Sequence, residues 1–203
     1  MINLRQLLCT LIFCCTLSCV AQKQQNPVYG TWVTNVASNA LLTKEHVKQT
    51  VQLCKDYGMN TLYVVVWNKG VTMYPSDVVN QYIGVKQDSV YQGFDPIKEI
   101  VDEGHKAGLK IYAWFEYGFA YDYADTSSIW LQKYPHWAGR DVKGNLLQKN
   151  KFYWWNSLHP EVQQFMTALV LEVVKKYNID GVQGDDRLPA MPSEGGYDNY
   201  TRQ

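Results

Sequence analysis

The sequence is poor in cysteine beyond its first 20 residues. Four of its five cysteines lie in that stretch, and only Cys54 follows it. We therefore expect no intramolecular disulfide in residues 22–203, and no cluster of Cys and His residues has the spacing of a zinc site. Cys54 follows Val47 and Val51 at helical spacing, which predicts a core position rather than a nucleophile.

An excess of basic residues is also missing. The 19 Lys and Arg residues balance the 19 Asp and Glu residues, whereas nucleic-acid-binding domains usually present a basic face. We therefore expect neither nucleic-acid binding nor a polybasic membrane contact. No glycine-rich fingerprint follows the first predicted strand, which disfavours a dinucleotide fold. The sequence implies no metal or organic cofactor and leaves the oligomeric state open.

The first 21 residues have the features of a signal peptide. Arg5 gives a weakly positive start, residues 7–20 form an apolar run, and small residues around Ala21 suit a signal peptidase. The run is too short for a comfortable membrane span. We expect export to the periplasm or the extracellular space, with residues 22–29 as a short linker. Acylation of Cys19, which would make a lipoprotein, is the alternative.

Four strand-then-helix steps follow the linker. The second strand, "NTLYVVVW", is apolar enough to be buried on both faces. Helix starts are marked by Thr43, by Asp95 before a proline, and by His159 before a proline. The expected strands cover residues 30–36, 60–67, 109–116 and 180–185, and the expected helices cover 43–58, 95–108 and 159–178.

The connections between these elements differ in length. Helix-to-strand links are very short, whereas residues 68–94 and 117–158 form long strand-to-helix links. The second of these contains an expected short helix at 127–134 and a hairpin turn about Lys143–Gly144. TIM-type (β/α)8 barrels build their active sites from such insertions. We predict an α/β fold in which residues 30–203 form about four β/α units, the N-terminal half of a barrel truncated at its C-terminus.

Polar side chains stand where the predicted strands end. Asn35 lies near the end of the first strand, Glu116 ends the third, and Asp185 ends the fourth, with Asp186 and Arg187 directly after it. In a barrel these positions converge on one pocket. A carboxylate there can act as a nucleophile, as a general acid or base, or as an acceptor for a substrate hydroxyl. A solvated turn with an arginine salt bridge is the structural alternative for the Asp pair.

Aromatic residues are frequent in the long links, and flat ring faces pack well against sugars. Most such residues nevertheless anchor cores or loops. The rings placed best by strand position for substrate binding are Trp67, Tyr74, Trp114 and Tyr117. Two other polar residues have structural interpretations: Asp180 begins the fourth strand at the opposite mouth, and His159 is expected to cap a helix.

Five stretches carry a family resemblance. They are "GTWVTNVAS", "YGMNTLYVVVWNKGVTMYPS", "AGLKIYAWFEYG", "NSLHPEVQQF" and "YNIDGVQGDD". In this order and spacing, over roughly residues 28–198, they resemble the glycosyl hydrolase-like 10 family of bacterial exported proteins. The resemblance implies a TIM-type barrel and glycoside hydrolase activity.

The fourth strand of that family typically reads Asp-Gly-Ile-His-Phe-Asp-Asp-Tyr. The matching positions here are Asp180, Gly181, Val182, Asp185 and Asp186, and the departing positions are Gln183, Gly184 and Arg187. The departures alter the expected floor of the pocket. The pattern is also similar to the fourth strand of alpha-amylase-type barrels, whose final Asp is the nucleophile. By that analogy the nucleophile here is Asp185.

The sequence thus predicts an exported glycoside hydrolase acting on a poly- or oligosaccharide. Asp185 would be the nucleophile or main catalytic carboxylate, and Glu116, Asp186 and Arg187 would orient it or bind hydroxyls. Because glycosidases commonly use two carboxyl groups, the second can also come from strands beyond these four. The alternative function, favoured by the departures at Gly184 and Arg187, is a catalytically inactive carbohydrate-binding or cell-envelope protein on the same barrel.

Overall fold

The computed structural model describes residues 27–185, 187–188 and 191–203. The predicted signal peptide with Cys19, most of the predicted linker and the candidate residue Asp186 lie outside the described residues. Among the described residues, no helix is both long enough and apolar enough to cross a membrane.

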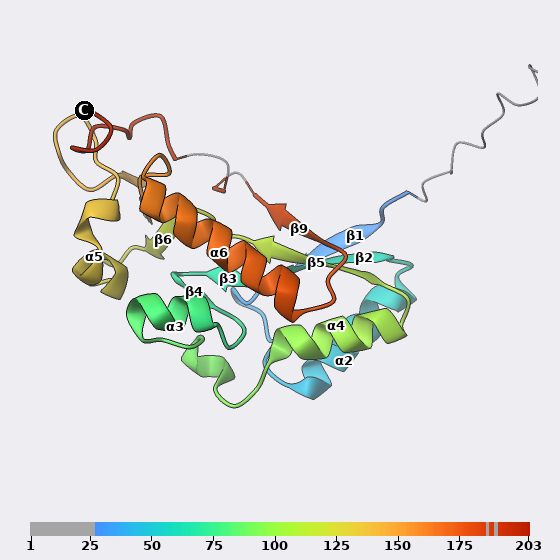
Figure 1. Cartoon of the computed structure of the whole chain (residues 1–203). Helices are drawn as coiled ribbons and strands as arrows, with labels where there is room; N and C mark the ends of the chain where they lie inside the picture. Colours follow the sequence, from blue (N-terminus) through green and yellow to red (C-terminus); the bar gives the residue numbers. More distant parts are fainter. Residues whose placement is uncertain (1–26, 186, 189–190) are drawn as a thin grey trace, which may run out of the picture.

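A four-stranded parallel sheet forms the centre of the structure (Figure 1). Each strand was predicted, although the expected ranges run past the observed ends. The strands, in their order across the sheet, are β1 (Gly30–Val33), β2 (Thr61–Val65), β5 (Lys110–Phe115) and β9 (Gly181–Gly184).

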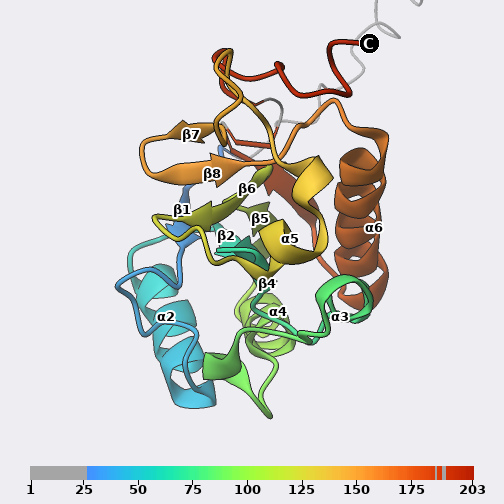
Figure 2. The same ribbon diagram turned by 90° about the vertical axis from the view of Figure 1, so that its left-hand side faces the viewer.

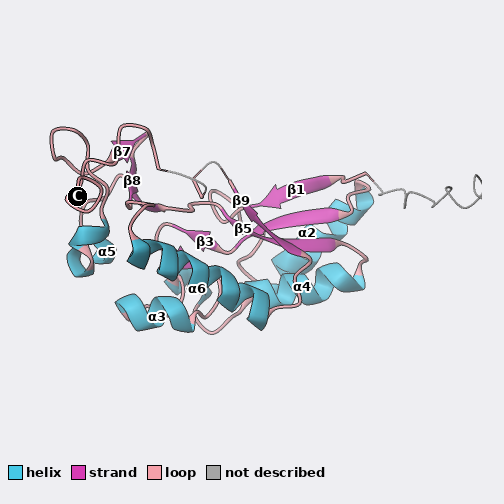
Figure 3. Ribbon diagram, turned by 45° about the horizontal axis from the view of Figure 1, so that its top comes forward, coloured by secondary structure: helices cyan, strands magenta, loops and turns pink. Residues whose placement is uncertain are grey.

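Three amphipathic helices cover one face of this sheet (Figure 3). They are α2 (Lys44–Asp56), α4 (Pro96–Lys106) and α6 (Pro160–Lys176). The predicted helix starts are confirmed. Thr43 caps α2 through its hydroxyl, Asp95 caps α4 through its carboxylate, and Nδ1 of His159 accepts from the amide of Glu161 in α6. Cys54 is buried on the inner face of α2, as its spacing predicted.

The opposite face of the sheet carries a row of aromatic side chains. The strand register aligns Trp32, Tyr63 and Tyr112 across β1, β2 and β5. The rings of Trp32 and Tyr63 stack with their centroids 5.3 Å apart, yet Trp32 remains 54% exposed. Nε1 of Trp32 also donates to Oε1 of Gln183 on β9 at 2.9 Å. This bond joins the two edge strands, which in a flat sheet would lie about 14 Å apart, so the sheet is strongly curved.

The two long links fold into small elements at one end of the sheet (Figure 2). The expected short helix and the turn at Lys143–Gly144 are present, the latter as a bridge between Arg140 and Leu146. That short helix is α5 (Ile129–Lys133). The elements that were not predicted are β3 (Trp67–Asn68), β4 (Val71–Thr72), α3 (Asp77–Ile83), η1 (Ser89–Tyr91), β6 (Ala120–Tyr123), η2 (Pro135–Trp137), β7 (Gln148–Lys149) and β8 (Phe152–Trp154).

An aromatic core anchors these links to α6. Its largest members are fully buried, namely Trp67, Trp130, Trp137, Trp155 and Phe165. The rings of Trp130 and Phe165 meet edge to face at 4.9 Å, and those of Trp67 and Trp155 stack at 6.1 Å. Burial of aromatic rings is a large source of stabilisation, so this cluster gives the long links a fixed conformation at the carboxyl ends of the strands.

Candidate active site

Glu116 lies immediately after β5, at the carboxyl end of the sheet. Its Oε2 accepts a hydrogen bond from Nδ2 of Asn68 at 2.6 Å and a longer one from the hydroxyl of Thr34 at 3.5 Å. Nδ2 of Asn68 also donates to Oδ1 of Asn35 at 3.0 Å. Residues that follow β1, β2 and β5 therefore meet in one polar cluster, as expected where parallel strands end together.

Arg187 connects Asp185 to Glu116. Its main-chain amide donates to Oδ1 of Asp185 at 2.8 Å, and its Nη2 donates to Oδ2 at 2.6 Å. Its Nε donates to the main-chain carbonyl of Glu116 at 2.9 Å. The guanidinium also lies over the ring of Phe152, with its carbon 4.8 Å from the ring centroid. One side chain thus orients the ends of the neighbouring strands β5 and β9.

Gly118 allows the two strand ends to come together. Its φ is +50°, a conformation that glycine adopts readily, and a Cβ there would collide with main-chain atoms of Arg187. The amide of Phe119, the next residue, donates to the carbonyl of Arg187 at 2.8 Å. The chain after β5 therefore packs directly against the chain after β9.

The two carboxyl groups differ in their electrostatic surroundings. Burial raises the pKa of Glu116, whereas the hydrogen bond from Asn68 and the charge of Arg187 oppose this rise. The negative charge of Asp185 adds to it. Asp185 is itself ion-paired with Arg187, whose Nη2 lies 2.6 Å from its Oδ2. Glycoside hydrolysis commonly uses two carboxyl groups whose environments push their pKa values apart, and the burial of Glu116 acts in that direction.

Two predicted substrate contacts are corrected by the structure. Trp67 is fully buried in the aromatic core, and its Nε1 donates to the carbonyl of Gly118. Tyr74 is also fully buried, and its hydroxyl donates to Oε2 of Glu172 on α6 at 2.9 Å. Because neither ring exposes a face, these residues pack in the core next to the site and do not contact a substrate.

The other aromatic candidates lie closer to the carboxylates. Trp114 is partly buried on the same face of β5 as Glu116, and its Nε1 has no hydrogen-bond partner among the described residues. Tyr117 is a third predicted substrate contact that the structure corrects, because it is buried and its ring packs edge to face against Phe152 at 5.1 Å. Tyr117 therefore forms part of the apolar support for Arg187.

Sequence reasoning missed Thr34 and Phe152 as members of the site. Thr34 lies two residues after Trp32, so alternation along the first strand could have placed it on the same face. Phe152 comes from β8 inside the second long link, and no sequence pattern places it beside Arg187.

Asp180 occupies the opposite end of β9, where its Oδ2 accepts from the amide of Ile111 and pairs with His105, which agrees with its expected structural role.

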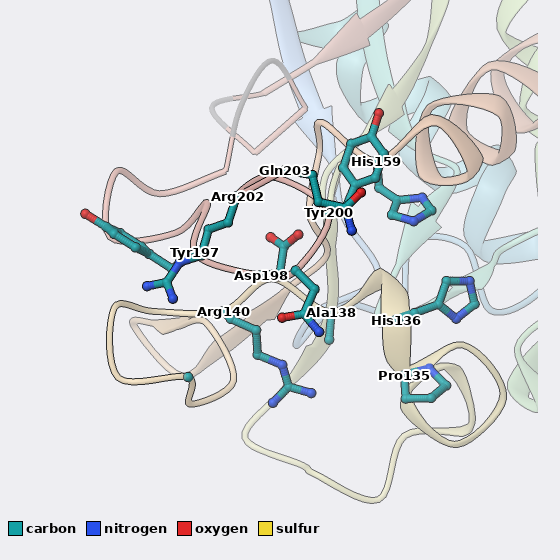
Figure 4. Close-up of a pocket in the computed structure, with 12 residues that line it drawn as sticks. Pro135, His136, Ala138, Arg140, His159, Tyr197, Asp198, Tyr200, Arg202 and Gln203 are labelled. Carbon is teal, nitrogen blue, oxygen red and sulfur yellow. The ribbon is translucent and has the colours of Figure 1, made fainter.

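Two cavities border this end of the molecule. One of about 200 Å³ lies beside Arg187 and is lined by Lys149, Asn150, Phe152, Trp154, Arg187, Met191 and Pro192. Another of about 500 Å³ lies at the start of α6 and includes none of the predicted site residues (Figure 4). Within the described residues, neither Glu116 nor Asp185 belongs to a group with metal-ligand spacing.

A family model described as glycosyl hydrolase-like 10 matches residues 27–203. The chain belongs to the glycosyl hydrolase-like 10 family. It is 27% identical over 190 residues to glycosyl hydrolase DigH of Escherichia coli K12 and 26% identical over 195 residues to glycosyl hydrolase YngK of Bacillus subtilis. Each alignment covers 84% of this chain but only 40% and 36% of the respective relative. The chain therefore spans less than half the length of these relatives.

Solved structures share the fold of this family member at low sequence identity. A hypothetical protein from Ruminiclostridium thermocellum aligns with a TM-score of 0.60 and 17% identity over 77% of this chain and 76% of that one. Alpha-L-fucosidase isoenzyme 2 from Paenibacillus thiaminolyticus aligns with a TM-score of 0.57 and 18% identity, over 79% and 23% of the two chains. The noncanonic maltogenic alpha-amylase AmyB from Thermotoga neapolitana aligns with a TM-score of 0.53 and 16% identity, over 78% of this chain and 38% of that one. The feature shared with these structures is the parallel β/α fold.

Proposed function

We propose that this chain is part of an exported glycoside hydrolase that cleaves the glycosidic bonds of a poly- or oligosaccharide. The observation that carries this proposal is the link from Asp185 through Arg187 to Glu116 at the ends of adjacent strands. The four described parallel strands and their three covering helices would belong to the N-terminal half of a (β/α)8 barrel. In such a barrel the strand ends face a common substrate pocket.

The two carboxyl groups have different roles in this proposal. Asp185, which is ion-paired with Arg187, is the main catalytic carboxylate and acts as nucleophile or as base for water. Glu116, whose pKa is raised by burial, supplies a protonated carboxyl to the departing sugar oxygen. Asn35 and Trp114, on the same side of the strand ends, contact substrate hydroxyls and a sugar face. Asp186 remains a predicted member of the site.

The test is hydrolysis by the full-length protein. A panel of bacterial and plant polysaccharides is incubated with the enzyme, and new reducing ends are measured. We expect release from at least one polysaccharide and a loss of about 1,000-fold or more in Asp185→Asn, because a catalytic carboxylate is removed. Glu116→Gln should lose activity as well. The control is Asp102→Asn on α4, whose exposed carboxylate pairs with Lys98.

One observation favours the second function, carbohydrate binding without catalysis. Arg187 engages both oxygens of Asp185, through its amide and through Nη2, and a nucleophile held in this way is less free to attack. Binding of a polysaccharide without release of reducing ends, unchanged in Asp185→Asn, would establish a binding protein and reject the hydrolase.

A further inference from the structure

Three potential metal ligands meet at the start of α6, away from the strand-end carboxylates. His136 comes from η2, His159 is the cap residue of α6, and Glu161 lies in its first turn. One ligand atom from each residue lies within 4.8 Å of the other two. Nε2 of His136 is 3.0 Å from Oε2 of Glu161, and the two imidazole centroids are 5.5 Å apart. Figure 4 shows the two histidines at the edge of the cavity.

We propose that His136, His159 and Glu161 bind a divalent transition-metal ion of the Zn²⁺ class. Zn²⁺ bonds to imidazole nitrogen and carboxylate oxygen are about 2.0–2.2 Å long, so two ligands on one ion lie about 3–3.5 Å apart. The separation between His136 and Glu161 already falls in this range, and the ligand atom of His159 lies within 4.8 Å of the other two.

The ligand types select among cations. Mg²⁺ and Ca²⁺ prefer oxygen ligands and usually several carboxylates, and this site offers one. Two imidazoles with one carboxylate suit Zn²⁺, Ni²⁺ or Cu²⁺. Three protein ligands leave a coordination position for water. Both histidines line the cavity of about 500 Å³, which gives an ion and its water a route from solvent.

Neighbouring residues hold the three ligands in place. Nε1 of Trp137 donates to Oε2 of Glu161 at 2.7 Å, and carboxylate ligands are commonly oriented by such outer hydrogen bonds. The ring of Tyr200 lies 4.8 Å from that of His159, which is only 9% exposed. The side chains of His136 and Glu161 are about half exposed, so they can adjust to an ion.

Metal binding would compete with two existing contacts. The Nδ1 atom of His159 accepts the amide of Glu161 at 3.3 Å, and Nε2 of His136 pairs with the Glu161 carboxylate. The first is at the long end of the hydrogen-bond range, and the second would be replaced by two bonds to one ion. The bound ion would tie η2 to the start of α6, so its binding should stabilise the fold.

The test uses the full-length protein, stripped with a chelator and dialysed. Thermal unfolding is followed with Zn²⁺ or with Mg²⁺, and Zn²⁺ binding is measured by titration calorimetry. At 100 times its dissociation constant, Zn²⁺ should raise Tm by about 3 °C or more, whereas Mg²⁺ should have no effect. The wild-type protein should bind one more Zn²⁺ than the ligand variants.

Three variants remove ligands while keeping the local fold. His136→Ala removes one imidazole, Glu161→Gln keeps an acceptor for Trp137, and His159→Asn keeps a side chain that caps helices well. Each should lose one Zn²⁺ and the rise in Tm. The matched control is His105→Ala, which removes a histidine paired with a carboxylate, Asp180, at 2.9 Å, a pair that belongs to no three-ligand group among the described residues. The control should bind Zn²⁺ as the wild type does.

Two results would overturn this site. One is a wild-type protein whose Tm does not change with Zn²⁺ and which shows no more binding than His136→Ala. The other is an equal loss of Zn²⁺ in His105→Ala, because binding would then depend on any His–carboxylate pair. Both readouts are independent of glycoside hydrolysis, so the outcome does not depend on the proposed function.

Discussion

The Nε atom of Arg187 donates to the main-chain carbonyl of Glu116 at 2.9 Å. The guanidinium therefore orients the backbone from which one carboxyl group projects, while its other end pairs with Asp185 at 2.6 Å. A planar side chain with donors in a fixed geometry can make both contacts at once. This relationship makes Arg187 a positioning residue for two strands.

Arg187→Lys should lower kcat/KM about 10- to 100-fold on any substrate found for the full-length protein. An ammonium group cannot reach both partners in the geometry of a guanidinium, and hydrogen bonds to charged groups are worth about 1.5–3 kcal/mol. The measurement is steady-state kinetics, with Arg140→Lys as the control. Equal kinetics in Arg187→Lys and wild type would show that charge alone is needed at this position.

Glu116 should make stability depend on pH in a predictable direction. Its pKa is raised from the ordinary 4.5 by burial, so the folded state holds this proton more tightly than the unfolded state. The group then costs no stability below pH 4.5 and becomes destabilising as pH rises through the raised pKa. Glu116→Gln keeps an acceptor for Asn68 but cannot ionise. The Tm of Glu116→Gln minus that of the wild type should therefore increase from pH 4 to pH 7; a constant or shrinking difference would contradict the raised pKa.

Gly118→Ala should destabilise the protein by about 2 kcal/mol or more and reduce activity. The substitution combines a strained positive φ with a collision against the main chain of Arg187. Gly58→Ala is the matched control, since Gly58 has a φ of +73° but no atom within 4 Å of the position that a Cβ would take. It should cost only about 1 kcal/mol. Denaturant unfolding of both variants measures this difference. An equal loss of unfolding free energy in the two variants would show that the close contact between residue 118 and the main chain of Arg187 adds no cost.

Glu172→Gln should destabilise the protein by about 2–4 kcal/mol. The carboxylate of Glu172 accepts from the hydroxyls of Tyr74 and Ser76 and from the amides of Asp77 and Val78. An amide would place an N–H group against some of these donors and leave them unsatisfied. The measurement is denaturant unfolding, with no change expected in metal binding.

Glu103→Gln provides the comparison, because this α4 carboxylate pairs with the exposed Lys106. It should change the free energy of unfolding by less than about 1 kcal/mol. Similar losses in the two variants would mean that the four donors around Glu172 are satisfied equally well by an amide.

The sheet and its covering helices could be predicted because their signals are local. Thr43, Asp95 and His159 mark helix starts in the sequence itself, and strand topology alone brought Glu116 and Asp185 together. Trp67 was misassigned because β2 ends at Val65, after which alternation no longer fixes the direction of a side chain.

The contents of the long links could not be predicted in the same way. The elements α3 and β6 to β8 depend on contacts with α6 and with the buried tryptophans, which no short-range pattern encodes. The meeting of His136 with His159 has the same origin, since η2 and the start of α6 come together only in the folded chain.

The hydrogen bond between Trp32 and Gln183 has a consequence for assembly. It links the two outer strands, β1 and β9, on one face of the sheet, so the curvature is already present in these four strands. A further strand that pairs with β1 or β9 would therefore extend a sheet that is already curved. Gln183→Leu would remove this hydrogen bond. We expect the distance between β1 and β9 to increase, so that an added strand would pair with a flatter sheet.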